Sequence, residues 1–497
     1  MVAARVSLSA VSAAGRAALR TLIDLAGPSR PVWLVGGAVR QLLAGEPVND
    51  LDLATPREAL ALGRALADRL GGRFVALDRE RGAGRVVGAG PGVPTIDLVD
   101  FRAPELDGDL RARDFTINAL AAPLAALLRD GEAPVIDPTG GLADLRGRVV
   151  RLAGPGAIGD DPVRALRGAR LAARPEWRLD PDTEAAIRAG ASRLDDVAAE
   201  RIRDELAAIL GDPRAATGLR MLDRLGLLAA FLPESASMRA TAQPLPHRFD
   251  VWEHSLQAVE AVDVLLADLD ALAPWGPGLR LHLAGGLGGG FTRREALRLA
   301  ALLHDVAKPE TRAELDGRIR FFGHDAVGAR RVPAIAERLR LPRRVSQVVE
   351  RLVAQHLRPM HLAQAGQITR RARFRFFRAL GDDAPDLLLL ALADAAGLTG
   401  VSPLAVWAGE GGAVVRALMA GAEAEAAATT APRLLRGEDV MAAFGLSPGP
   451  AVGRLLERAR EAQALGLVES REEALDYLRG PAGRDDSREG GEPRVGT

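Results

Sequence analysis

The secondary-structure signal of the chain changes near residue 150, and this change restricts the folds open to it. Between residues 31 and 150, short apolar runs such as RFVAL and PTIDLVDF are separated by glycine and proline turns, a pattern typical of strands. From about Asp160 onward, apolar residues recur three and four positions apart, which indicates amphipathic helices. We therefore expect an α+β fold, in which a head with a mixed sheet and helices is followed by all-α regions.

Composition narrows the protein class. The chain has 497 residues, enough for several domains, and 48% of them are hydrophobic but only 4% aromatic, as in Ala- and Leu-rich helical proteins. The absence of cysteine excludes disulfides and thiolate metal sites. The 65 basic and 65 acidic side chains cancel, so a nucleic-acid partner would have to meet a local basic face. No apolar run is long enough to span a bilayer and no signal peptide is evident, so we expect a cytoplasmic protein without membrane contact.

Segments rich in glycine, proline or alanine divide the chain further. A glycine-rich stretch at 278–292 predicts a loop or mobile insertion, and an alanine-rich stretch at 421–431 predicts a connector. The end of the chain is polar and glycine-rich, which is typical of disorder. The predicted parts are a helical N-terminal extension (1–30), the head (31–150), a helical neck (151–240), a second helical domain (247–400), a helical tail (430–480) and a disordered end (481–497).

The first candidate site lies in the head. A short apolar strand runs into Gly36-Gly37, and a predicted helix bearing Arg40 follows. A glycine turn at a helix N-terminus offers N–H groups to phosphate oxygens, and Arg40 adds a guanidinium fork. Asp50 and Asp52 come next in a predicted strand, where residues two apart point to the same face. Paired carboxylates of this kind can hold Mg²⁺ against a triphosphate and help to activate a hydroxyl.

These motifs, LVGGAVRQLLAG and DLDLAT, resemble the signature of the tRNA nucleotidyltransferase/poly(A) polymerase family, whose heads are polymerase-β-like nucleotidyltransferases. A second family motif is similar to residues 109–120, and the resemblance implies that Arg113, Asp114 and Asn118 lie near the sugar and phosphates of the incoming nucleotide. Asp97, on a neighbouring predicted strand, either completes the metal site or is a structural residue.

A predicted helix in the neck carries charged residues three positions apart, namely Asp161, Arg164, Arg167 and Arg170. Composition alone favours a ladder of ion pairs on a solvated face. The family resemblance implies instead that Asp161 and Arg164 read the base edge of CTP or ATP and that the arginines bind the nucleotide. The family commonly has Asp at Gln41 and Glu at Asp160, and these departures bear on nucleotide choice. A further neck motif at 200–206 predicts mainly structural salt bridges.

The second candidate site is built from histidines and aspartates in the block 247–400. The order His254, His304-Asp305, Asp394 resembles the HD superfamily of metal-dependent phosphohydrolases. Such side chains bind a divalent transition metal or Mg²⁺ and activate water. His324 and His356 have the positions of second-metal or phosphate-side groups. Lys308, the only lysine in the chain, follows the His-Asp pair, where its charge could meet a phosphate.

The resemblance implies a template-independent nucleotidyltransferase that adds CCA to the 3′ end of tRNA from CTP and ATP, with catalytic Asp50 and Asp52 binding Mg²⁺. One alternative keeps the reaction and changes the product, giving poly(A) or only the CC or A part of CCA. An alternative of another class is an HD phosphohydrolase whose head only binds RNA.

Overall fold

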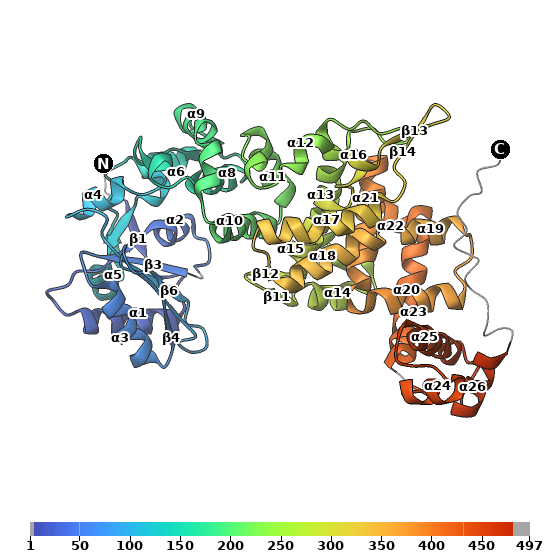
Figure 1. Cartoon of the computed structure of the whole chain (residues 1–497). Helices are drawn as coiled ribbons and strands as arrows, with labels where there is room; N and C mark the ends of the chain where they lie inside the picture. The colour runs from blue at the N-terminus through green and yellow to red at the C-terminus, as the bar shows by residue number, and fades with distance from the viewer. Residues whose placement is uncertain (1–3, 49, 431, 481–497) are drawn as a thin grey trace. The chain divides into compact units, whose positions relative to one another are not determined.

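The computed structural model describes residues 4–48, 50–430 and 432–480, and the chain forms two compact units (Figure 1). The first unit comprises Met1–Ile209 with Thr217–Pro233, and the second comprises Leu210–Ala216 with Glu234–Thr497. Within the described ranges, no helix has both the length and the apolar character needed to cross a bilayer. The predicted disordered end, 481–497, lies outside the described residues.

A six-stranded mixed sheet forms the centre of the head, in the order β4-β5-β6-β3-β2-β7. Strands β3 and β6 run parallel, and the other neighbours in this sheet are antiparallel. Its strands are β2 (Trp33–Val35), β3 (Asp50–Thr55), β4 (Arg73–Asp78), β5 (Ala83–Val87), β6 (Thr95–Asp100) and β7 (Ala121–Pro123). The helices of the head are α1 (Ala13–Ala26), α2 (Gly36–Ala44), α3 (Ala59–Leu70), α4 (Leu106–Arg111), α5 (Leu124–Asp130) and α6 (Gly141–Gly147).

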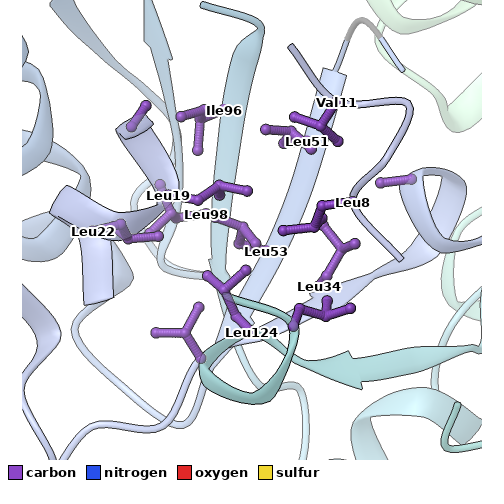
Figure 2. Close-up of a cluster of buried hydrophobic side chains, with 14 of the residues drawn as sticks. Leu8, Val11, Leu19, Leu22, Leu34, Leu51, Leu53, Ile96, Leu98 and Leu124 are labelled. Atoms are coloured by element: carbon purple, nitrogen blue, oxygen red, sulfur yellow. The ribbon is translucent and has the colours of Figure 1, made fainter. Parts of the chain in front are cut away.

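The hydrophobic core on one face of the sheet determines the direction in which the polar side chains of β3 point. Leu51 and Leu53 of β3 and Leu98 of β6 pack in the same buried cluster as Leu19 and other residues of α1 (Figure 2). Because side chains alternate along a strand, Asp50 and Asp52 are turned away from this core. The hydrophobic contacts of β3 therefore orient the two carboxylates.

The segment predicted as an N-terminal extension lies in the head itself. Strand β1 (Arg5–Ser7) pairs with β8 (Glu132–Pro134), and Leu19 and Leu22 of α1 are fully buried in the core of the head. The segment contains the helix that was expected, α1, but local sequence could not show which surface this helix covers.

The neck follows the head through a short parallel pair, β9 (Val149–Val150) and β10 (Arg178–Leu179). Its helices are α7 (Ala157–Asp160), α8 (Arg164–Ala172), α9 (Pro181–Ala189), α10 (Ala199–Gly211) and α11 (Ala215–Arg224). Gly168 in α8 packs so closely on Phe115 that an added Cβ would lie 2.8 Å from the ring. This close approach brings the charged residues of α8 next to the second motif of the head.

The second unit is almost entirely helical. Its core is built around α13 (Val251–Ala267), α15 (Arg293–Leu303), α17 (His324–Arg338), α18 (Arg343–Gln355) and α21 (Ala384–Thr399). The surrounding elements are α12 (Glu234–Arg239), α14 (Gly276–Leu283), α16 (Lys308–Thr311), β13 (Ala313–Leu315), β14 (Arg318–Arg320), α19 (Arg358–Gln364), α20 (Arg370–Leu380), α22 (Pro403–Ala408) and α23 (Ala413–Thr430). The tail consists of α24 (Gly437–Phe444), α25 (Pro450–Ala464) and α26 (Arg471–Arg479), with its own apolar cluster.

The expected α+β class is confirmed, since the mixed sheet of the head is followed by helical regions. The glycine-rich stretch 278–292 differs from the predicted loop. It contains most of α14 and a small hairpin, β11 (Gly286–Gly288) with β12 (Phe291–Thr292), in which Leu287 and Phe291 are buried. The glycines allow the tight reversal, and these two side chains anchor it. The predicted connector at 421–431 is helical up to Thr430.

Candidate functional site

The first site lies in an open cleft between the head and the neck helices of the first unit. Gly36 begins α2 with a φ of +69°, and a Cβ there would lie 3.2 Å from Oδ2 of Asp52. A residue without a side chain is therefore required at this point. The N–H of Gly36 donates to the carbonyl of Leu120 at 3.1 Å, so it is part of the fold and is not turned to a phosphate.

Asp50 and Asp52 lie on the same face of β3, and Asp97 faces Asp52 directly across the parallel strands β3 and β6. Burial, followed by the charge of Asp97, raises the pKa of Asp52 above its ordinary value. Both carboxylate oxygens of Asp97 accept hydrogen bonds at 2.8 Å from Arg85. This concentration of negative charge suits a divalent cation, and Asp50 and Asp52 have the hard oxygen ligands that Mg²⁺ prefers.

Asp114 joins the head to the neck. One oxygen accepts from the backbone N–H of Phe115 and the amide of Asn118, at 2.8 and 3.1 Å, and the other accepts from Arg167 at 2.9 Å. Although burial opposes ionisation, Arg167 and these hydrogen bonds lower the pKa of Asp114 to about 2. Arg167 and Arg170 of α8 both donate to Glu205 of α10, each at 3.0 Å.

Arg40 is buried at the same cleft, and it donates to the side-chain carbonyl of Asn118. Its Nε has no hydrogen-bond partner. Burial, followed by the charge of Arg174, lowers the pKa of the guanidinium to about 10. A buried cation that lies near Arg174 and Arg170 and retains an unpaired donor is suited to an anion such as a phosphate.

The predicted base-reading residues differ in their contacts. Asp161 accepts from Arg201 of α10 at 2.7 Å, and its other oxygen has no partner. Arg164 donates to the backbone carbonyls of Ala112, Arg113 and Ala157, at 3.2, 3.3 and 3.3 Å. Arg113 itself is bound by Asp109, at 3.1 and 2.8 Å. The structure therefore brings together, along one cleft, all the residues of the head and neck that were predicted to bind metal or nucleotide. Several of them form hydrogen bonds with one another.

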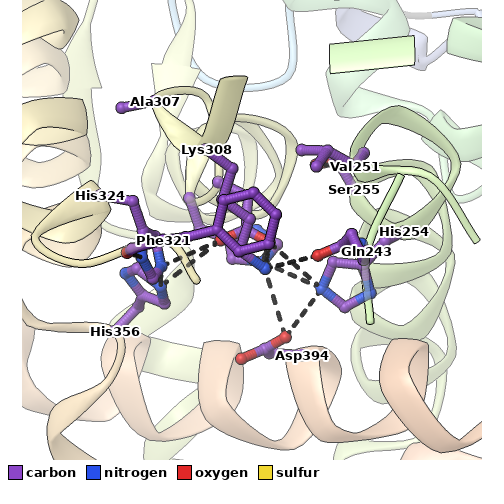
Figure 3. Close-up of polar contacts among 12 residues, drawn as sticks. Gln243, Val251, His254, Ser255, Ala307, Lys308, Phe321, His324, His356 and Asp394 are labelled. Carbon is purple, nitrogen blue, oxygen red and sulfur yellow. Dashed lines mark hydrogen bonds and ion pairs between the residues drawn. The ribbon is translucent and has the colours of Figure 1, made fainter. Parts of the chain in front are cut away.

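The second site lies among buried side chains of the second unit, and Figure 3 shows how they converge. His254 of α13 lies 3.0 Å from Asp394 of α21 and 3.2 Å from His304, which follows α15. Asp305 is close to both histidines, with its Oδ2 3.2 Å from Nε2 of His304 and 3.6 Å from Nε2 of His254. His254, His304 and Asp305 form one group whose ligand atoms lie close enough together to hold a metal ion, and Asp394 lies beside this group.

Asp305 also takes part in a second group. Its other oxygen, Oδ1, lies 3.3 Å from Nε2 of His324 and 3.8 Å from Nε2 of His356. The two Nε2 atoms of His324 and His356 are 3.2 Å apart, while each Nδ1 lies 2.7 Å from a backbone carbonyl, those of Phe321 and Val353. A neutral histidine that donates from Nδ1 has a lone pair at Nε2, so two such atoms facing each other fit a shared cation.

Charges around this site also suit a metal. Burial, followed by the charge of His304, lowers the pKa of His356 to about 4, which keeps it in the neutral form that binds metals. Despite burial, Asp305 and Asp394 raise the pKa of His304 to about 10, which means that the carboxylates attract positive charge to this position. Lys308 lies 2.6 Å from Asp305 and donates to Gln243 at 2.7 Å.

Comparisons with known proteins match both sites. Residues 32–151 match the family model of the poly(A) polymerase head domain, 177–238 a probable RNA- and SrmB-binding site of polymerase A, and 251–395 the HD domain. The chain is 38% identical over 452 residues to an A-adding tRNA nucleotidyltransferase of Deinococcus radiodurans, covering 90% of this chain and 94% of that protein.

The chain belongs to the tRNA nucleotidyltransferase/poly(A) polymerase family.

A second relative is the CC-adding tRNA nucleotidyltransferase of Thermus thermophilus, 38% identical over 454 residues, which cover 89% of this chain and 92% of that protein. Among solved structures, a CCA-adding enzyme in complex with ATP aligns with a TM-score of 0.60 and 19% identity, covering 96% of this chain and 99% of the other. At that identity the structural match supports the fold. Together with the head domain, the relatives show that this family member is a nucleotidyltransferase.

Three contacts in this nucleotidyltransferase were missed from the sequence. They are Arg201 with Asp161, Arg85 with Asp97, and Gln243 with Lys308. Each joins residues on different elements, and Gln243 lies in an irregular segment with no motif. Of these three contacts, only that of Arg85 with Asp97 could have been predicted from the sequence. These residues lie on neighbouring antiparallel strands, which commonly place opposite charges across from each other.

Proposed function

We propose that this nucleotidyltransferase adds C and A residues of the CCA end to the 3′ end of tRNA, using CTP and ATP without a nucleic-acid template. The observation that carries the proposal is the cleft in which Asp50 and Asp52 lie together with Arg40 and the Asp114–Arg167 pair. Relatives at equal identity are named for adding A and for adding CC, which favours a product that is only part of CCA as the second candidate. A cytoplasmic location and tRNA as partner belong to the same proposal.

The residues of the cleft have separate tasks in this reaction. A Mg²⁺ ion held by Asp50 and Asp52 would supply charge neutralisation at the triphosphate and favour ionisation of the attacking 3′ hydroxyl. Arg40, with its unpaired buried donor, binds the phosphates. Asp114 and Asn118 hold the sugar side, and Arg113 is kept in place by Asp109. The 3′ oxygen bonds to the α-phosphorus, and the bond to pyrophosphate breaks.

Base selection is assigned to the neck. The exposed edges of cytosine and adenine both carry an amino donor, where uracil and guanine carry a carbonyl acceptor. Oδ1 of Asp161 is a buried carboxylate oxygen without a partner, and it can accept a hydrogen bond from that amino group. Uracil and guanine offer no donor there and leave this oxygen unsatisfied.

The test uses tRNAs that end before CCA, after CC and after the complete CCA, each supplied with CTP, ATP or both. We expect extension that stops at the terminal A, and the substrate that is extended identifies a CC-, A- or CCA-adding product. Long A tails on any of these tRNAs would overturn CCA addition in favour of poly(A) synthesis. Asp52→Asn is expected to abolish addition with every tRNA.

We further propose that the HD domain is a phosphohydrolase. Its first divalent metal ion would be bound by His254, His304, Asp305 and Asp394, and His324 and His356 would bind a second ion. The Nε2 atoms of His324 and His356, which lie 3.2 Å apart, support this proposal. Lys308 would meet the phosphate of the substrate. Hydrolysis of phosphomonoesters and of 2′,3′-cyclic phosphates is measured with Mn²⁺, Ni²⁺ or Mg²⁺. Activity that is absent with every metal, or unchanged in Asp305→Asn, would contradict the proposal.

A further inference from the structure

The two oxygens of the Asp161 carboxylate have different surroundings. Oδ2 accepts a hydrogen bond from Nη2 of Arg201 at 2.7 Å, while Oδ1 is buried and has no partner. Burial opposes ionisation of Asp161, but the hydrogen bond and charge of Arg201 outweigh it and lower the pKa of the acid. The residue is 7% exposed and lines the cleft. Asp161 therefore has one oxygen fixed by the protein and one available to a donor from a ligand.

Arg164 does not compete for this role in the structure. Its guanidinium is occupied by three backbone carbonyls, two of which belong to the segment that carries Arg113 and Asp114. It lies 3.9 Å from the carboxylate of Asp161, beyond hydrogen-bond distance. Arg164 thus fixes the position of the head motif, whereas Arg201 is the residue that donates to Asp161.

Arg201 reaches Asp161 from another helix. Asp161 directly follows α7, and Arg201 lies in the first turn of α10, forty positions further along the chain. The side chain of Arg201 is 48% exposed, so it adds little to the hydrophobic core of the neck. A charge-assisted hydrogen bond to one oxygen restricts rotation of the carboxylate and thereby fixes the direction of the other oxygen.

We propose that Arg201 is a positioning residue for base selection: by binding Oδ2 of Asp161, it aims Oδ1 at the amino group that cytosine and adenine share. The inference rests on the proposed transfer from CTP and ATP. Without Arg201, the carboxylate can turn and be hydrated, and its discrimination against bases with a carbonyl at this position falls.

The experiment compares Arg201→Ala, Arg201→Lys and the control Arg188→Ala in single-nucleotide addition to tRNA with each of the four nucleoside triphosphates. Arg188 is a matched neck arginine that pairs with Glu184 and the carbonyl of Arg224, away from the cleft. We expect Arg201→Ala to lower the preference for CTP over UTP, or for ATP over GTP, by about 10- to 100-fold, with partial rescue in Arg201→Lys. The control should keep the wild-type preference.

A double-mutant cycle separates positioning from general structure. In an Asp161→Ala background, Arg201→Ala should cause no further loss of base preference. A parallel decrease with all four nucleotides, or an equal loss of preference in both backgrounds, would overturn the positioning role.

Equilibrium binding of the same four nucleotides is measured alongside transfer. Selective binding without transfer by the wild type would overturn the proposed function and leave the role of Arg201 to be judged from binding. Equal binding of all four nucleotides by the wild type, or a base preference unchanged in Arg201→Ala, would overturn the inference about Arg201.

Discussion

The head site and the HD site hold their acidic groups in opposite ways. In the head, Asp52 has Asp50 and Asp97 as neighbours, and burial together with these like charges raises its pKa. In the HD site, His304 and Lys308 outweigh burial at Asp305, and the hydrogen bonds of His254 and His304 outweigh it at Asp394, so the pKa values of both acids are held well below the ordinary range. Asp50 is exposed in an open cleft, whereas Asp305 is 1% exposed.

This difference indicates two kinds of metal site. Asp52 lies beside the carboxylates of Asp50 and Asp97, so we expect Asp50 and Asp52 to bind an ion that arrives with the nucleotide, as is usual for Mg²⁺. In the HD site, backbone carbonyls fix His304, His324 and His356, as is usual for histidines that bind a resident metal. We therefore expect an exchangeable ion at the head and a permanent one at the HD domain.

The largest expected effect would come from removing one carboxylate from each site. Asp52→Asn should lower nucleotide addition at least about a thousandfold, because a metal ligand supplies several kcal/mol of charge stabilisation in the transition state. It should leave HD hydrolysis unchanged, and Asp305→Asn should show the reverse pattern. Both activities are measured on each purified variant. Loss of both activities in Asp52→Asn would mean that the two sites are not independent.

Metal content should separate the resident ions from the exchangeable one. After dialysis against metal-free buffer, we expect the wild type to retain two ions per chain at the HD site and none at the head. His356→Ala should retain one ion, with the second bound at least about 100-fold more weakly, since even outer partners of metal ligands are worth 10- to 100-fold. Asp305→Ala should retain none, because Asp305 belongs to both groups. Metal analysis of Asp52→Asn, expected to match the wild type, is the control.

A resident metal should also stabilise the second unit. A ligand present at about 100 to 1,000 times its dissociation constant stabilises the folded state by roughly 3–4 kcal/mol. Strong chelation should therefore lower the melting temperature of the wild type, and Mn²⁺ should restore it. Thermal unfolding is followed by calorimetry with and without chelator. A shift of equal size in Asp305→Ala would show that the stabilising ion lies elsewhere.

The two sites also differ in how far the sequence revealed them. The faces of Asp50 and Asp52 followed from strand alternation, because Leu51 and Leu53 had to be buried. The HD ligands followed only from the order of histidines and aspartates in a known family, since they come from separate helices that no local pattern brings together. Asp97 was left open, and the register of β3 with β6 is what sets it opposite Asp52.

Contacts between distant segments could not be read from the sequence. Arg201 was expected to make structural salt bridges, and its hydrogen bond to Asp161 depends on how α10 packs against the end of α7. The core position of α1 in the head likewise depends on tertiary packing. Periodicity predicts which face of an element is apolar, but it does not identify the element that covers this face.

The smallest expected effect concerns Asp114, a buried carboxylate of the head that, like those of the HD site, is kept ionised by a neighbouring basic side chain. Arg167 is the main cause of the low pKa of Asp114, about 2, because burial alone would raise it. The acid is then ionised at every pH at which the enzyme works. In Arg167→Met the burial stays and the cation is lost, so the pKa of Asp114 should rise above the ordinary carboxyl range. Nucleotide addition by this variant should then decline as the pH falls towards about 5, because Asp114 becomes protonated. In the wild type, Asp114 should stay ionised over this range.

This shift is measured as kcat/KM for nucleotide addition between about pH 5 and 8. Arg170→Met is the matched control, because Arg170 pairs with Glu205 and has no hydrogen bond to Asp114. It should lower activity without moving the acid limb of the profile. If both variants moved the limb equally, the general positive charge of the cleft, rather than the pairing of Arg167 with Asp114, would keep that carboxylate ionised. The head would then resemble the HD site only in its summed charge, without a dedicated cation for this acid.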